Sequence, residues 1–321
     1  MQKPYLRYRI VPMDSSLFVF KAIDVLLDKA ENSVEYPLVT TEEVSYDSRF
    51  LRTKADIKYV GEKGKKRPVI FYIPGGGFVA GDKQHRREIT GFFASKGYAV
   101  FCANLRTAPE FPFPNPLEDL VTALNFLYDN SNEYGFDTDN VIFAGDSSGG
   151  YYASYAVALA THPTLREELN LPELKVKPRA LIFLSGVVDL IKMVKLRDPL
   201  MIARNTGRHF LNYKLKWGAT NAKSHEFYKY LSPANFVTEN WCPTFLSYSK
   251  KDLFCGGQGE ILDEKLTQFA IEKRKHVATR LFDNHCYILF SKKKKAREAQ
   301  ELLAEFLLKF SKRNDALPVA T

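Results

Sequence analysis

The distribution of apolar residues along the chain predicts strands that alternate with helices. Short apolar runs rich in β-branched and aromatic residues are typical of buried strands, and apolar residues at helical spacing predict helices. The predicted strands span residues 68–73, 98–103, 141–144, 178–185, 244–249 and 277–282. The predicted helices span residues 17–29, 83–96, 116–128, 258–271 and 294–310. This alternation predicts an α/β fold with a mostly parallel central sheet and helices on both faces.

Two segments depart from this alternation. Residues 43–46 and 55–60 are β-like runs around a polar connection, which predicts an antiparallel pair at a sheet edge. Residues 189–235 are mostly helix-compatible and rich in large apolar side chains. Because insertions after a strand's carboxyl end lie over the site in such sheets, we interpret this segment as part of a lid. We predict one domain over residues 1–321, with a helical cap from about 1–40 and 190–235; the alternative is a packed helical excursion with no role in binding.

A tight strand-to-helix turn carries the first candidate chemistry. The sequence Gly145-x-Ser147-x-Gly149 follows the strand at 141–144 and precedes an alanine-rich helical run. Glycines on both sides let a strained turn close and let a substrate approach the serine. The N–H groups at the start of the helix point at the position where negative charge develops in acyl transfer. This pattern is a nucleophile elbow; the alternative is a surface turn that happens to carry glycine and serine.

A glycine-rich loop follows the predicted strand at 68–73. Its sequence is Pro74-Gly75-Gly76-Gly77-Phe78. Three consecutive glycines are entropically costly, so a structural need is expected. A flexible loop is one interpretation. The other is a loop whose bare N–H groups approach a ligand and complete an oxyanion hole with the elbow.

A serine nucleophile needs a base, and the base needs an anion. Acidic residues lie at the ends of the predicted strands that come after the elbow, and two histidines come later in the chain than all of them. His276 lies at a basic helix end and is interpreted as solvated, whereas His285 follows the last predicted strand and is the favoured base. Asp252, which follows strand 244–249, is the favoured acid, and Asp189 is its best rival. Asp283 is too close to His285 in sequence to be preferred.

Several motifs together resemble the hormone-sensitive-lipase-like esterases of the α/β-hydrolase fold. The elbow is similar to that family's Gly-Asp-Ser-Ala-Gly-Gly, and the glycine loop to its His-Gly-Gly-Gly. The segments that carry the resemblance are Gly145-Asp-Ser-Ser-Gly-Gly150, Arg106-Thr-Ala-Pro-Glu110, Phe113-Pro114, Pro74-Gly-Gly-Gly-Phe78 and Ser232-Pro233. The resemblance covers roughly residues 40–310, and the elbow combined with Arg-x-Ala-Pro-Glu is specific.

This resemblance implies a serine esterase with a helical cap and no required metal or cofactor. The implied catalytic triad is Ser147, Asp252 and His285, and the implied oxyanion hole consists of the amides of Gly76, Gly77 and Ser148. The chain departs from the family at Pro74, where the family has histidine, and at Ser148, where it has alanine. Cys255 and Cys286 lie next to triad members in sequence, and buried packing is their default interpretation.

The expected reaction is hydrolysis of short- to medium-chain or aromatic carboxylic esters through an acyl-enzyme on Ser147. An amidase, formamidase or acyltransferase could use the same residues, and sequence alone does not separate these reactions. A third hypothesis is a non-catalytic small-molecule receptor on a hydrolase scaffold. The expected partner is a small-molecule ester, and a homodimer is left open.

Composition narrows the remaining possibilities for partners, membrane insertion and localisation. The chain has 321 residues, 45% of them hydrophobic, and a formal net charge of +9. The charge is concentrated at residues 63–67, 192–223 and 292–295, and we interpret it as solvated surface because no nucleic-acid motif accompanies it. We expect neither a nucleic-acid partner nor stable membrane insertion. The four cysteines lack metal-type spacing, and the N-terminus lacks a secretory signal, which predicts free thiols in a cytoplasmic protein.

Overall fold

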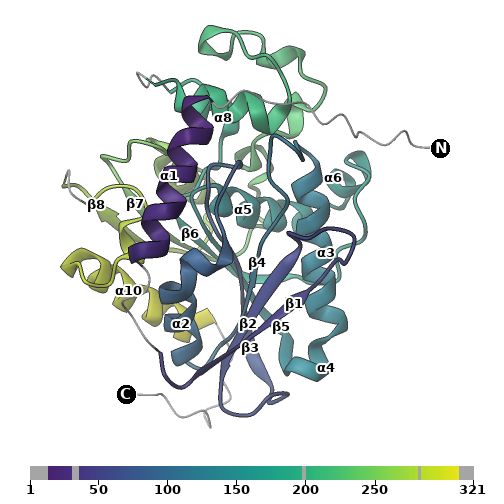
Figure 1. Cartoon of the computed structure of the whole chain (residues 1–321), viewed down its shortest axis with the longest axis vertical. Coiled ribbons are helices and arrows are strands. Elements are labelled where there is room, and N and C mark those ends of the chain that lie inside the picture. Colours follow the sequence, from purple (N-terminus) through teal and green to yellow (C-terminus); the bar gives the residue numbers. More distant parts are fainter. Residues whose placement is uncertain (1–13, 31–35, 197–199, 281–282, 311–321) are drawn as a thin grey trace.

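The computed structural model describes residues 14–30, 36–196, 200–280 and 283–310 (Figure 1). Over these residues one sheet of eight strands has the order β1-β2-β4-β3-β5-β6-β7-β8. The strands are β1 (Val39–Ser45), β2 (Lys54–Val60), β3 (Arg67–Ile73), β4 (Ala99–Ala103), β5 (Phe136–Asp146), β6 (Pro178–Leu184), β7 (Thr244–Ser249) and β8 (Lys273–Ala278). The pairs β1–β2 and β2–β4 are antiparallel, and the others are parallel. The predicted mostly parallel sheet is confirmed.

Helices cover both faces of this sheet and form a separate core on each. The longer helices are α1 (Ser15–Ala30), α2 (Arg87–Ser95), α3 (Asn115–Asp129), α5 (Ser148–Thr161), α8 (Ile202–Leu211), α9 (Gln258–Gln268) and α10 (Lys294–Phe310). In β3, Val69 and Phe71 belong to the core with α3, α5 and α9, whereas Ile70 and Tyr72 belong to the core with α2 and α10. Side chains alternate between faces along a strand, so a strand covered on both sides reads as one continuous apolar run.

Short helical segments connect these elements. They are η2 (Lys83–Arg86), α4 (Ser131–Tyr134), α6 (Pro163–Glu168), α7 (Leu190–Met193), η3 (Trp217–Ala219), η4 (Ala222–Ser224), η5 (Tyr228–Tyr230), η6 (Pro233–Phe236) and η7 (Tyr287–Leu289). The helix predicted at 83–96 is thus a short 3₁₀ segment followed by α2. Among the described residues, no helix combines the length and apolar character required to cross a membrane.

The last strand lies earlier in the chain than the apolar pattern predicts. β8 covers Lys273–Ala278 instead of 277–282, and residues 281–282 lie outside the described residues. β8 is an edge strand whose side chains are mostly partly or fully exposed, so its lysines and arginine face solvent and leave no apolar run to detect. His276 therefore lies on a strand, and its interpretation as part of a basic helix end was wrong.

The charged turn before β3 also contains a buried group. Arg67 is 1% exposed and begins the strand, although the pattern predicts a surface turn through this residue. Its guanidinium donates hydrogen bonds to the carbonyls of Lys65 (2.6 Å), Val60 (2.7 Å) and Glu62 (2.9 Å). The fork of N–H donors in arginine satisfies several turn carbonyls at once, which explains why a charged side chain is retained there.

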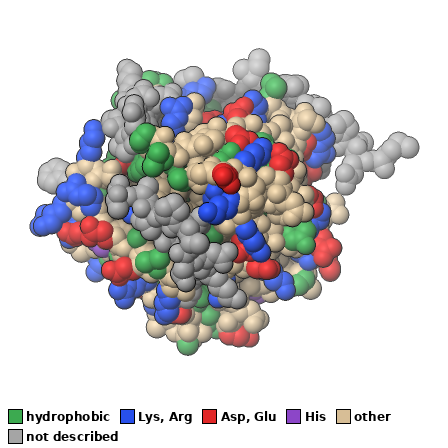
Figure 2. Space-filling model, turned by 90° about the horizontal axis from the view of Figure 1, so that it is seen from below, with side chains coloured by type: hydrophobic (Ala, Val, Ile, Leu, Met, Phe, Trp, Pro, Cys, Tyr) green, Lys and Arg blue, Asp and Glu red, His purple; other side chains and the backbone are tan. Residues whose placement is uncertain are grey.

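Other basic residues are paired with acids at the surface. Lys63 forms ion pairs with Glu42 (2.8 Å) and Glu133 (3.1 Å), and Lys66 lies 3.3 Å from Asp137. On the face seen in Figure 2, Lys and Arg side chains lie among Asp and Glu side chains. This mixture supports the interpretation of the positive charge as solvated surface, which stays a prediction.

The N-terminal helix packs against the excursion between β6 and β7. Figure 1 shows α1 beside α8 at one end of the molecule. Asp14 accepts a 2.8 Å hydrogen bond from the ring Nε2 of His209, and Ser15 Oγ donates one of 2.6 Å to the Leu200 carbonyl. Two segments almost two hundred residues apart are therefore joined by polar contacts as well as by packing.

The Arg-x-Ala-Pro-Glu segment is held by a buried ion pair. Arg106 and Asp119 are 3% and 1% exposed, and the Arg106 Nε and backbone N–H each donate a 2.7 Å hydrogen bond to the Asp119 carboxylate. The guanidinium also stacks 4.0 Å from the ring centroid of Phe50. Removing one partner of such a pair leaves an uncompensated buried charge.

We expect Arg106→Met to lower the free energy of unfolding by about 3–5 kcal/mol, because Asp119 would stay buried without its cation. Urea denaturation followed by circular dichroism measures this change. Arg49→Met is the matched control: Arg49 pairs with Asp47, but its side chain is 64% exposed, so the cost should stay below about 1 kcal/mol. Equal losses in the two variants would contradict this account of the buried pair.

Candidate active site

Ser147 lies on a strained turn between β5 and α5. Its backbone has φ 53° and ψ −123°, a region that residues with a Cβ rarely adopt. A Cβ on Gly149 would overlap the carbonyl of Ile73 at the end of β3, and one on Gly145 would overlap the backbone of Gly149. Only glycine allows this close approach of three backbone segments. The turn thereby projects the serine from the carboxyl edge of the sheet, where parallel strands commonly place their sites.

The residue before the serine anchors the turn. Asp146 is fully buried and accepts hydrogen bonds from Arg86 Nη2 (2.7 Å), Arg86 Nε (2.8 Å) and the Tyr72 hydroxyl (2.7 Å). Burial opposes the charge of the carboxylate, but the Arg86 guanidinium and the Tyr72 hydroxyl hold the pKa of Asp146 below its ordinary value. The carboxylate therefore stays ionised and ties the turn to β3 and η2.

Asp252 and His285 form a hydrogen-bonded pair at the same edge. The His285 Nδ1 lies 2.9 Å from Oδ2 and 3.0 Å from Oδ1 of Asp252. Asp252 Oδ1 also accepts the backbone N–H groups of Phe254 (2.9 Å) and Cys255 (2.8 Å), so the carboxylate caps its own turn. A carboxylate on Nδ1 leaves Nε2 of the imidazole as the atom that can accept a proton.

The Asp252 carboxylate and the His285 imidazolium stabilise each other. Burial opposes the carboxylate, but His285 and the turn N–H groups lower the pKa of Asp252. Burial likewise opposes the imidazolium, but the Asp252 carboxylate, which is hydrogen-bonded to the ring, raises the pKa of His285 well above 6.5. The neighbouring Cys286 thiol is itself neutral, because burial raises its pKa to about 11.

Cys255 lies near both the elbow serine and the predicted base. One ligand atom from each of Asp252, Cys255 and His285 lies within 4.8 Å of the others. The Cys255 sulfur also lies beside the Ser147 side chain. Within the described part of the chain, the structure contains no hydrogen bond between Ser147 and His285. The three predicted triad residues thus lie at one edge of the sheet, with the Cys255 thiol among them.

The glycine loop lies directly against the elbow. A Cβ on Gly75 would come within 2.7 Å of the Ser147 Cβ. The Gly76 N–H donates a 3.0 Å hydrogen bond to Ser148 Oγ, the hydroxyl that stands where the resembled family has alanine. This amide can receive a substrate oxygen only after its bond to Ser148 opens. The roles of Gly76, Gly77 and Ser148 as oxyanion donors stay predictions.

An aromatic side chain from α1 covers the loop. The Phe20 ring occupies the space that a Cβ on Gly77 would need. The Phe20 ring centroid lies 6.2 Å from that of Phe254, which in turn lies 5.2 Å from the His285 ring. Phe20 and Phe254 therefore form an apolar cover that connects the glycine loop with the imidazole.

The rival acid and base have other partners. Asp189 caps α7 by accepting the Lys192 N–H (2.9 Å), and it accepts the Ser232 hydroxyl (3.1 Å). His276 bonds through Nδ1 to the Tyr287 hydroxyl (2.5 Å), which lies on the α10 side of the sheet. Among the described residues, neither Asp189 nor His276 forms a hydrogen bond or ion pair with the elbow, and the structure favours Asp252 and His285.

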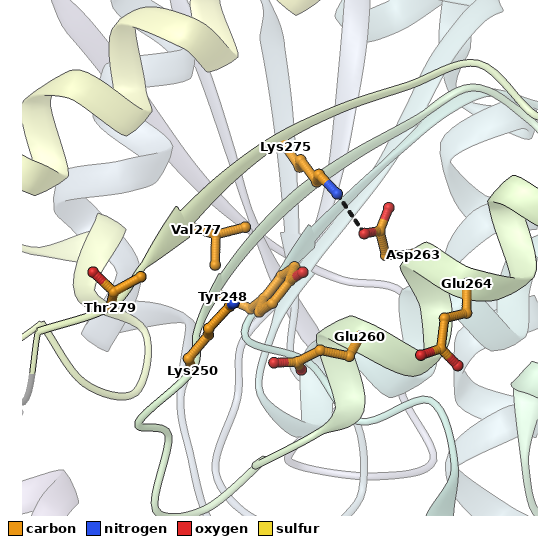
Figure 3. Close-up of a pocket in the computed structure, with 8 residues that line it drawn as sticks. All are labelled: Tyr248, Lys250, Glu260, Asp263, Glu264, Lys275, Val277 and Thr279. Carbon is orange, nitrogen blue, oxygen red and sulfur yellow. Dashed lines mark hydrogen bonds and ion pairs between the residues drawn. The ribbon is translucent and has the colours of Figure 1, made fainter.

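The structure also contains a hollow that lies away from the predicted site residues. It has a volume of about 480 Å³ and lies between β7, β8 and α9 (Figure 3). It is lined by Tyr248, Lys250, Glu260, Asp263, Glu264, Lys275, Val277 and Thr279. Lys275 and Asp263 point toward each other there in a 2.6 Å ion pair. No predicted site residue lines this hollow, so we place the candidate chemistry at Ser147 instead.

Three side chains of the site were not identifiable as such from the sequence pattern. Phe20 and Arg86 belong to helices far from the elbow in sequence, and only the fold brings them to it. Cys255 follows Asp252 by three residues, and this spacing was a usable signal. An aspartate that caps its own turn brings the third residue after it close to its carboxylate.

Comparison with known proteins places this chain in a family. The family model described as BD-FAE matches residues 55–266, well over half of the chain. The probable carboxylic ester hydrolase LipM of Mycobacterium tuberculosis is 25% identical over 186 residues, which are 58% of this chain and 41% of LipM. Carboxylesterase NlhH of the same organism is 29% identical over 136 residues, 38% of this chain and 43% of NlhH. The chain thus spans less than half the length of these curated relatives.

Solved structures confirm the fold. The crystal structure of esterase B from Lactobacillus rhamnosis matches with a TM-score of 0.79 and 19% identity, over 93% of this chain and 95% of that chain. At this identity the similarity shows the fold alone. Together with the strand order, it establishes the predicted α/β-hydrolase fold.

The raised pKa of His285 can be tested without an assay of activity. Imidazole resonances followed by NMR through a pH titration should show His285 titrating above 6.5 in the wild type. Asp252→Asn should lower this pKa, because the burial that opposes the imidazolium remains while the carboxylate that favours it is lost.

His276 is the internal control in both proteins. Burial and the Lys295 charge lower the pKa of His276 below 6.5, and it should titrate at the same pH in the variant. If His285 titrated at an unchanged pH after Asp252→Asn, the carboxylate would not be the cause of its shift.

Proposed function

Because this chain belongs to the BD-FAE family of hormone-sensitive-lipase-like α/β hydrolases, we propose that it is a serine carboxylesterase. The observation that carries the proposal is the Asp252–His285 pair, with Nδ1 and Oδ2 2.9 Å apart, at the sheet edge that presents Ser147. A carboxylate-oriented imidazole beside an elbow serine is the arrangement that activates a hydroxyl for acyl transfer.

In the first half of the proposed reaction, Ser147 Oγ attacks the ester carbonyl carbon while His285 Nε2 takes the hydroxyl proton. Asp252 holds the other ring nitrogen and stabilises the imidazolium. The tetrahedral intermediate collapses to an acyl-enzyme, and the departing alcohol takes the proton from His285. In the second half, His285 removes a proton from water, the hydroxide releases the acid, and Ser147 recovers its proton.

This sequence requires two local rearrangements. Ser147, whose side chain lies beside Cys255, must form a hydrogen bond with His285, which a rotation about χ1 can provide. Gly76 must release Ser148 Oγ before its N–H can join those of Gly77 and Ser148 at the oxyanion. Hydrogen bonds of this kind often tighten or exchange only when substrate binds. Substrate binding therefore supplies the free energy that completes the site.

The proposed substrates are carboxylic esters with short to medium acyl groups or aromatic groups. Phe20 and Phe254 form an apolar wall next to the glycine loop. Phe20 lies on α1 and is partly exposed, and its ring limits the space above the loop. We assign α1 and the segment 190–235 to a cap over the site, supported by the contacts between α1 and α8. Such a cap encloses the acyl group in a partly apolar space and selects acyl length.

The nucleophile can be tested with p-nitrophenyl acetate and butyrate. Ser147→Ala should lower kcat/KM by about 10⁴-fold or more, because no other group supplies the attacking oxygen. A fluorophosphonate probe should label the wild type at Ser147, as mass spectrometry of the digested protein would show.

Ser154→Ala is the matched control for this test. Ser154 is a buried serine on α5, the helix that follows Ser147, and its hydroxyl has no hydrogen-bond partner among the described residues, so labelling and hydrolysis should persist. Hydrolysis retained by Ser147→Ala would refute its assigned role, and absence of labelling in the folded wild type would favour the receptor hypothesis.

Phe20 should set the acyl-chain preference. In Phe20→Ala the ring that lies against Gly77 is removed, so the ratio of kcat/KM for p-nitrophenyl hexanoate to that for acetate should rise by about tenfold. Phe18→Ala changes an aromatic residue on the same helix that is 62% exposed, and it should leave the ratio unchanged. A similar rise in both variants, or in neither, would mean that Phe20 does not limit the pocket.

A further inference from the structure

Three different metal-binding side chains converge beside the elbow serine. Asp252, Cys255 and His285 offer a carboxylate oxygen, a sulfur and a ring nitrogen that lie within 4.8 Å of one another. Asp252 and Cys255 are buried, and the side chain of His285 is 19% exposed. The hydrolytic reaction proposed above uses the carboxylate and the imidazole but gives the thiol no role.

Local structure explains why the thiol faces this place. The carboxylate of Asp252 accepts the N–H of Cys255 at 2.8 Å, so the chain turns back over the aspartate. This turn places a residue three positions later on the same side as the carboxylate. The Cys255 sulfur lies beside the Ser147 side chain and within 4.8 Å of ligand atoms of Asp252 and His285, so it faces the centre of the site. Cys286 differs, because its sulfur lies 3.9 Å from both Asp146 Oδ2 and the Leu184 carbonyl.

We propose that Asp252, Cys255 and His285 form a binding site for Zn²⁺ that inhibits the enzyme. Zinc prefers sulfur, imidazole and carboxylate donors, and three protein ligands plus one open position are common for it. A thiolate and a carboxylate together neutralise the charge of the ion, which favours the complex in a buried place. Small rotations of the three side chains would shorten separations of up to 4.8 Å to those of a tetrahedral site.

Binding proceeds without any change of oxidation state. The Cys255 thiol releases its proton to solvent, and the thiolate forms a bond to zinc. The His285 imidazolium releases one ring proton to solvent, donates the lone pair of that nitrogen to the metal and retains its proton on the other nitrogen. Asp252 exchanges part of its hydrogen bonding to His285 for a bond to zinc. The fourth position is left to water or to Ser147 Oγ.

Inhibition follows from the competition for the imidazole. A lone pair bound to zinc cannot accept the Ser147 proton, and a carboxylate bound to zinc no longer orients the ring. The metal therefore switches the base off reversibly, and a chelator restores it. The inhibitory consequence rests on the proposed esterase function, whereas metal binding itself does not.

Binding is tested first, with Co²⁺ as a spectroscopic substitute for Zn²⁺. Wild-type protein titrated with Co²⁺ should develop a near-ultraviolet thiolate-to-cobalt charge-transfer band with a stoichiometry of one, which Zn²⁺ abolishes by displacement. Ser147→Ala should retain the band. A band in protein that hydrolyses no ester would refute the esterase proposal and leave the metal site standing. Absence of the band in the folded wild type would overturn the site.

The ligands are then identified by matched cysteine variants. Cys255→Ser should weaken metal affinity at least about tenfold, the scale seen when even an outer partner of a ligand is lost, and should abolish the charge-transfer band. Cys242→Ser alters another buried cysteine that lies before β7, away from the elbow, and should keep the band. If Cys255→Ser fails to fold, Cys255→Ala replaces it, and the wild-type spectrum remains decisive.

Inhibition is measured on p-nitrophenyl acetate with and without free Zn²⁺. Wild type and Cys242→Ser should lose activity as Zn²⁺ rises and regain it with EDTA. The concentration giving half inhibition should be at least about tenfold higher for Cys255→Ser. Equal sensitivity of wild type and Cys255→Ser, or loss of sensitivity in Cys286→Ser alone, would overturn the assignment of Cys255.

Discussion

The close approach of bare backbone at the elbow is the constraint on which the site depends. The turn after β5 passes so near the end of β3 that a side chain at Gly149 would overlap the carbonyl of Ile73. This contact brings the glycine loop and the serine together, because the loop begins directly after β3. A single methyl group would separate two segments that bind one substrate oxygen in the proposed reaction. Packing density, more than any polar contact, therefore brings the elbow and the loop together.

Charge then holds what packing has brought together. Asp146 is buried against Arg86 and Tyr72, which ties the elbow to β3 and η2. Asp252 is held by the N–H groups of its own turn and by His285. Each carboxylate has enough partners to remain ionised in a nearly dry place. The two aspartates nevertheless have different roles. Asp146 anchors the backbone of the elbow, and Asp252 holds the orientation of the His285 imidazole.

Close packing also means that, without substrate, the side chains of the site contact one another. Ser147 lies beside Cys255, the Gly76 N–H donates a hydrogen bond to Ser148, and Phe20 lies against Gly77. Substrate, or a metal ion, must replace these contacts with contacts of its own. Selectivity in this protein therefore depends on how well a ligand's own contacts replace those that it displaces.

The local sequence determined the elements whose signals are strong over a few residues. Continuous apolar runs predicted β3 and β7 almost to the residue, and the glycines around Ser147 predicted its turn, because backbone conformation and burial on both faces restrict composition locally. Candidate triad residues could be selected because the carboxyl ends of parallel strands share an edge. The edge strand β8 was misplaced, since exposure to solvent allows it charged residues and removes the apolar signal.

Only the tertiary structure decided the contacts between segments that are distant in the chain. Nothing near Cys255 in the sequence indicates that its sulfur meets Ser147, and nothing near Phe20 indicates that its ring covers Gly77. Arg67 reads as a surface charge until three turn carbonyls are seen to converge on it. Composition and spacing report what one segment prefers, whereas these contacts depend on the relative placement of several segments. That placement is set by the packing of the whole sheet and its helices.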